Sequence, residues 1–140
     1  SYLRAAFKQR GLDYDAQKRT LANYDIQGKD PVCGKTVTRP KEAGEIWLDG
    51  GDIVPLSSPV CTFMGIKKYQ DAGKKIAVVY LFDQGLGIKV FADRAFYAVN
   101  GSGAKLDVVP FLLKKDAETS AAKSGGTVAT YEQVLAKMEK

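Results

Sequence analysis

The chain has 140 residues, a length that suits one ordinary domain or two small repeated units with a shared core. Hydrophobic residues make up 45% of the sequence and charged residues 26%, which excludes a disordered or collagen-like chain. The net charge of +5 is spread along the sequence in pairs such as Lys67 and Lys68. Because no long basic run occurs, we expect a solvated surface and no nucleic-acid partner.

The first part of the chain, residues 1–27, is predicted to be an N-terminal helical extension. Leu3 and Phe7 recur at helical spacing, and Gly11 stands where a first helix would end. A second short helix is expected after it, packed with the first on the outside of the main fold. No apolar stretch reaches the roughly 18 residues of a membrane span. No signal-like segment opens the chain. Because the sequence starts at Ser1 without a methionine, we interpret it as a mature or trimmed form.

The main domain is predicted to cover residues 28–140 and to begin with a turn over 28–34, followed by a short strand at 36–38. Its first unit, about residues 43–83, opens with a hairpin of two β-rich runs, 45–48 and 52–56, around a Gly-Gly turn. A helix then follows from Pro59 to about residue 72. Ser58 is its N-cap, Pro59 fits the first helical position, and Gly73 ends the helix. Residues 76–82 are short and rich in β-branched side chains, which predicts a buried central strand.

The second unit, about residues 88–130, repeats this order after a connecting strand at 88–91. A second hairpin over 96–111 is followed by a helix at 115–124, a Gly-Gly stop and a return strand at 127–129. A closing helix is predicted at 131–138. Two consecutive ββαβ units must cover each other's apolar faces, so we predict an α+β fold with both units packed as one compact body.

The residues most suited to chemistry are the two cysteines, Cys33 and Cys61, because the chain contains no histidine. Cys61 is the third residue of the first predicted helix, where the positive end of the helix dipole favours a thiolate. Met64 follows one turn later on the same face. Two thiolates and a thioether form a soft, low-coordinate set suited to Cu(I), with Met138, Asp30 or water as a fourth ligand. A structural zinc site would require four ligands, so zinc is the weaker hypothesis.

Simpler interpretations remain open at this point. Cys33 and Cys61 can instead form a disulfide that closes a loop of about 29 residues. They can also be two inert thiols, with Met64 in the core. Without histidine, a His-based triad or a His-ligated catalytic metal is excluded, and the glycine turns match no phosphate-binding motif. We therefore predict that the protein is not an enzyme.

Several motifs resemble the NosL family in order and spacing. They lie at residues 30–37 (DPVCGKTV), 55–64 (PLSSPVCTFM), 80–83, 95–99, 109–111 and 124–127. This resemblance covers roughly residues 28–137. Members of that family are periplasmic, usually lipid-anchored copper proteins associated with assembly of nitrous oxide reductase. Their fold is a pair of ββαβ units, similar to that of organomercurial lyases. The turn at 30–34 with the later cysteine is also similar to the small metal-associated YHS and TRASH modules, but that likeness ends near residue 69.

By position, the resemblance implies that Cys33 corresponds to the cysteine of the family's Cys-Gly-Met turn. Cys61 and Met64 then correspond to the sulfur ligands near the first helix. Lys35 replaces the turn methionine, and Asp30 stands where many members have another cysteine.

The resemblance implies a periplasmic Cu(I)-binding metallochaperone, tethered to a membrane as a lipoprotein like most of the family. Its partner would be a copper-accepting metalloprotein or assembly factor. One alternative is a structural or partner-binding protein with a Cys33–Cys61 disulfide. A less favoured alternative is an organomercurial-lyase-like enzyme, in which two thiolates hold mercury while a carboxylate directs the proton.

Overall fold

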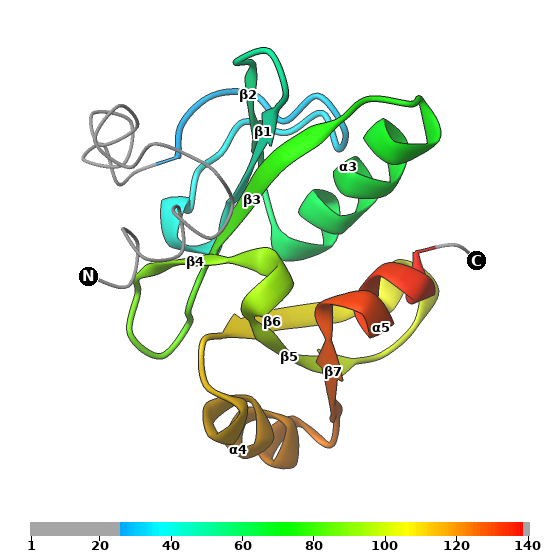
Figure 1. Ribbon diagram of the computed structural model, residues 1–140. Helices are drawn as coiled ribbons and strands as arrows, with labels where there is room; N and C mark the ends of the chain where they lie inside the picture. Colours follow the sequence, from blue (N-terminus) through cyan, green and yellow to red (C-terminus); the bar gives the residue numbers. More distant parts are fainter. Residues whose placement is uncertain (1–25, 139–140) are drawn as a thin grey trace.

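The computed structural model describes residues 26–138, so the predicted extension, apart from its last two residues, lies outside the described part of the chain. Two antiparallel sheets are packed with helices on and between them (Figure 1). The strands are β1 (Gly44–Leu48), β2 (Ile53–Leu56), β3 (Ile76–Phe82), β4 (Lys89–Phe91), β5 (Phe96–Asn100), β6 (Asp107–Phe111) and β7 (Thr127–Thr130). The helices are α3 (Pro59–Asp71), α4 (Lys114–Ser124) and α5 (Tyr131–Lys137), with short 3-10 turns η1 (Pro40–Glu42), η2 (Ala92–Arg94) and η3 (Gly103–Lys105).

The two sheets share one strand plan. Their strand orders are β2-β1-β3-β4 and β6-β5-β7, and all pairings are antiparallel. In each sheet the first strand of the unit lies between its hairpin partner and the strand that returns after the helix. The predicted pair of ββαβ units and the α+β fold are therefore confirmed. The connecting strand, β4, extends the first sheet at its β3 edge.

Helix α3 begins and ends where local sequence signals place it. The Ser58 side chain accepts a hydrogen bond of 3.1 Å from the Cys61 amide, and Pro59 occupies the first turn. After the helix, Gly73 has a φ of +74°, a conformation that favours glycine over residues with a Cβ atom. The buried face of α3, which carries Phe63 and Ile66, is packed on the first sheet.

The approach of α3 to β1 depends on a glycine. A Cβ atom at Gly44 would overlap the Oγ1 atom of Thr62 and lie 2.9 Å from the side chain of Leu81. Because position 44 has no side chain, the first turn of α3 can lie directly against the sheet at Thr62, the residue that follows Cys61.

One core joins both units. It contains Ile46 from β1, Phe63 from α3, Tyr97 from β5 and Val134 from α5. Along β5 the side chains alternate, so the opposite face of the second sheet is covered by α4 (Figure 1). The prediction of one compact body is thus confirmed.

The predicted strand at 36–38 is wrong. Thr36 forms an isolated bridge with Lys29, and the Val37 amide donates to the Gly28 carbonyl, but no ladder continues. The segment that pairs with it, residues 28–29, is too short because the chain enters a tight turn at Asp30. None of the helices described in residues 26–138 is long and apolar enough to cross a membrane.

Candidate metal centre

The two cysteines meet at the start of α3. They are 28 residues apart in the sequence, yet their Cα atoms are 6.1 Å apart and their sulfurs form a disulfide of 2.12 Å. The sequence-based expectation that folding brings Cys33 and Cys61 together is confirmed. Two simpler alternatives were left open, a disulfide and two inert thiols. The structure records the disulfide and not two separate thiols.

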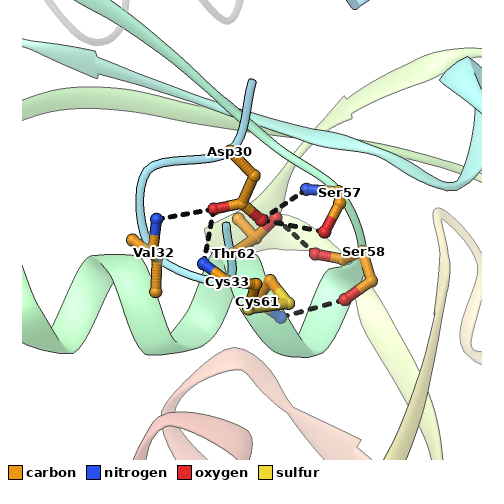
Figure 2. The surroundings of a disulfide bond; sticks show 7 residues. All are labelled: Asp30, Val32, Cys33, Ser57, Ser58, Cys61 and Thr62. Atoms are coloured by element: carbon orange, nitrogen blue, oxygen red, sulfur yellow. Dashed lines mark hydrogen bonds between the residues drawn. A yellow bond between two sulfur atoms is a disulfide. The ribbon is translucent and has the colours of Figure 1, made fainter. Parts of the chain in front are cut away.

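Each cysteine is positioned by a different local structure. Cys61 lies in the first turn of α3 and is 9% exposed, and its amide is capped by Ser58. Cys33 is partly buried and lies in the turn that follows Asp30, next to Gly34, whose φ is +75°. Figure 2 shows this turn lying against the beginning of the helix.

Asp30 connects the two segments that carry the cysteines. Its side chain is fully buried and accepts four hydrogen bonds (Figure 2). One carboxylate oxygen accepts from the amides of Val32 (2.7 Å) and Cys33 (2.8 Å). The other accepts from the amide (2.8 Å) and the hydroxyl (2.9 Å) of Ser57, which lies two residues before α3. Burial raises the pKa of Asp30, but the bonds from Cys33, Ser57 and Val32 outweigh it and hold the pKa below its ordinary value.

Ligand atoms of Asp30, Cys33 and Cys61 all lie within 4.8 Å of one another, so the three side chains form one cluster. As a disulfide, the sulfurs have no thiolate to offer a metal. After reduction the same pair would present two soft ligands at the positive end of a helix. The oxygens of Asp30 already accept two hydrogen bonds each, so binding a metal there would require some of these bonds to break.

Met64, the third predicted ligand, lies on α3 one turn after Cys61. Its side chain is 43% exposed, so the alternative in which Met64 fills the core is wrong. No contact described for Met64 joins it to the disulfide, and its role as a ligand stays a prediction. Met138, considered as a fourth ligand, is partly buried against the main core.

A second copy of the Asp30 turn follows β3. One oxygen of the buried Asp83 accepts hydrogen bonds from the amides of Gly85 (2.6 Å) and Leu86 (3.0 Å). The other accepts from the amide of Leu112 (3.0 Å), which lies two residues before α4.

The backbone bonds of the two turns also match. The Gly34 amide donates to the Asp30 carbonyl at 2.9 Å, and the Gly87 amide donates to the Asp83 carbonyl at 2.7 Å. Sequence reasoning missed this role of the two aspartates. The signal was present as two Asp-x-x-x-Gly segments, at 30–34 and 83–87.

A pocket of about 300 Å3 opens beside the cluster. Lys35, Ser57 and Ser58 line it from the cysteine side, and the opposite side is lined by Gln84, which follows β3, and by residues 107–110 of the second unit. Neither cysteine is among the described residues that line it. The pocket therefore borders the turn after Cys33 and the segment before α3, next to the cluster.

Comparison with known proteins identifies the fold. The chain matches no protein-family model and no curated protein sequence. Among solved structures it is similar to the copper chaperone NosL from Shewanella denitrificans, with a TM-score of 0.60 over 78% of this chain and 90% of that one. The chain has the NosL fold. Sequence identity to that NosL is 20%, so the likeness concerns the fold, and it confirms the NosL-like architecture expected from the sequence motifs.

Proposed function

We propose that this protein binds Cu(I) through the reduced thiols of Cys33 and Cys61 and passes the ion to an acceptor metalloprotein. The observation that carries the proposal is the meeting of these two sulfurs at the first turn of α3. Cu(I) is a soft ion that accepts a low coordination number and prefers sulfur ligands. The similarity to a copper chaperone in fold supports the same conclusion.

Transfer is favoured by the small number of ligands. An ion held by two thiolates, with the Met64 thioether as a weak third ligand, leaves room for a ligand of the acceptor to bind before the first ligand leaves. Cys33 is partly buried rather than enclosed, so an incoming thiol can approach from that side. We propose binding and delivery rather than catalysis.

The finer parts of the proposal concern place and partner. We infer an extracytoplasmic, periplasmic setting from the Cys33–Cys61 disulfide, because disulfides persist mainly in oxidising compartments. A lipid anchor and an acceptor of the nitrous oxide reductase maturation type follow from the resemblance to NosL proteins and are part of the proposal.

Competition for Cu(I) with a chromogenic chelator tests the proposed function. The protein, reduced with an excess of a non-thiol reductant, should take up one equivalent of Cu(I), and the oxidised protein should take up none. The double variant Cys33→Ser, Cys61→Ser should lose binding, whereas Ser102→Ala, a change at an exposed loop serine, should not. Equal uptake by the double variant and the parent would show that the site is wrong.

A structural protein is the second candidate, and the disulfide itself favours it. If the bond serves only as a cross-link, it should remain intact at the redox potential of the protein's own compartment, and the native mass should be two hydrogens lower than that of the dithiol. Cleavage of a model organomercurial, dependent on both cysteines, would instead support the enzyme alternative. Asp30 lies beside both sulfurs, as that alternative requires, but four hydrogen bonds already engage its carboxylate.

A further inference from the structure

Asp30 holds together two segments that the disulfide also joins. Through one oxygen it fixes the amides of Val32 and Cys33, and through the other it fixes Ser57. The Cys33 turn is therefore attached to the start of α3 by a buried carboxylate as well as by the sulfur–sulfur bond. Hydrogen bonds to a charged acceptor are the stronger kind, so this attachment has a substantial strength of its own.

The turn before the second unit shows the same attachment without a disulfide. Asp83 fixes the amides of Gly85, Leu86 and Leu112, with distances of 2.6 to 3.0 Å. Leu86 stands in the place of Cys33, three residues after the aspartate. The third residue of α4, in the place of Cys61, is Asp116. The turn thus adopts its geometry where no sulfur–sulfur bond can form.

We propose that Asp30 is a positioning residue that keeps Cys33 opposite Cys61 when their disulfide is reduced. Reduction adds two electrons and two protons, supplied by two thiol groups of a reductant that become a disulfide, and leaves two thiols. With the Asp30 bonds intact, these thiols stay close enough to bind one ion together or to re-form the disulfide. The consequence for copper rests on the proposed function, whereas the positioning does not.

The same bonds argue against Asp30 as a metal ligand. Each of its oxygens accepts two hydrogen bonds, and its side chain is fully buried. A metal would have to displace hydrogen bonds that end on a charged acceptor, which are the stronger kind. Asp30 therefore acts on the site through the backbone of Cys33 and through Ser57.

The test is the effective concentration of the two thiols, measured by equilibrating the full chain in glutathione redox buffers and quantifying the dithiol and disulfide forms by alkylation and mass spectrometry. Asp30→Asn should lower this effective concentration on the order of ten- to a hundredfold, the equivalent of one lost hydrogen bond to a charged group. Asp83→Asn is the matched control. It should lower the melting temperature in a similar way but leave the effective concentration within about twofold of the parent value.

An unchanged effective concentration in Asp30→Asn, or an equal fall in Asp83→Asn, would overturn the inference. If Asp30→Asn does not fold, Ser57→Ala removes only the hydroxyl donor at 2.9 Å and should lower the effective concentration severalfold. No change in that folded variant would also contradict the proposal.

Copper titration of the same samples separates the two claims. A fall in effective concentration, in a protein whose parent form binds no Cu(I), would uphold the positioning role and refute the chaperone function. If the parent binds Cu(I) and Asp30→Asn does not alter the effective concentration, the chaperone function would be upheld and the positioning role refuted.

Discussion

Cys33 and Leu86 occupy the same position in two copies of one turn. Each follows a buried aspartate by three residues, and each donates its amide to that aspartate at 2.8 and 3.0 Å. The two copies differ in the surroundings of the side chain at this position. Cys33 is bonded to Cys61, whereas Leu86 is 63% exposed. The NosL fold of this chain therefore contains the same aspartate-held turn twice, and only the first copy carries a cysteine.

The disulfide should contribute to stability chiefly by limiting the unfolded chain. It joins residues 28 positions apart, for which the loop-entropy relation gives about 3–4 kcal/mol. Urea unfolding of the oxidised and reduced protein should show a difference of that size. The variant with both Cys33 and Cys61 changed to serine should be insensitive to reductant. Equal stabilities of the oxidised and reduced protein would contradict this view.

Met64→Leu tests the third predicted ligand. Because Met64 is 43% exposed, the change should leave the melting temperature nearly unaltered. If the thioether binds the ion, Cu(I) affinity should fall on the order of tenfold, equivalent to about 1.4 kcal/mol. Met138→Leu is the control, since Met138 is packed against the core and should affect stability more than copper. An unchanged affinity in Met64→Leu would leave a site of two thiolates.

The contact between α3 and β1 predicts a strong effect of Gly44→Ala. The added methyl group would overlap Thr62 Oγ1, so the free energy of unfolding should fall by about 1–3 kcal/mol or more. Gly65→Ala is the comparison. Its Cβ would lie 3.0 Å from the flexible end of Ile46, and alanine favours the helix, so the net effect should be small. Equal losses in both variants, measured by chemical unfolding, would refute the role given to Gly44.

Tyr97, beneath α3, makes the fold sensitive to alkali. Burial raises its pKa well above 10.0, with smaller contributions from Tyr131 and Asp93, and its hydroxyl donates to the Ala92 carbonyl. In the unfolded chain the phenol ionises near its ordinary pKa, about 10, while the folded protein keeps it neutral. The stability due to Tyr97 should thus be constant below about pH 10 and be lost as the pH rises through the folded pKa.

Urea unfolding at pH 8 to 11.5 gives the free energy of unfolding of the parent and of Tyr97→Phe. The difference between the two reports Tyr97 alone, because the titration of the other tyrosines and of the lysines is common to both proteins and cancels. The difference should shrink or change sign above about pH 10. Parallel curves for the two proteins would show that Tyr97 does not titrate differently in the folded state.

Local sequence signals were sufficient for the elements that carry the site. Ser58, Pro59 and Gly73 gave the ends of α3, and the β-branched run at 76–82 gave β3, because capping and strand preference depend on neighbouring residues. The repeated hairpin and helix then predicted the two units.

Features that depend on distant contacts were not predictable in this way. The role of Asp30 depends on Ser57, which is 27 residues away, and composition cannot show which donors a carboxylate will meet. The exposure of Met64 depends on which side of α3 faces the sheet, and spacing relative to Cys61 did not settle that. The short pairing of Thr36 with Lys29 likewise depends on how soon the chain turns.

The central claim is that the reduced sulfurs of Cys33 and Cys61 together hold a soft cation. Copper K-edge X-ray absorption on the reduced protein with one equivalent of Cu(I) tests it most directly, because it reports the ligand atoms themselves. The account predicts at least two sulfur neighbours, both lost in the variant with both cysteines changed to serine. A coordination shell of oxygen and nitrogen alone, or a spectrum unchanged by that double substitution, would contradict it.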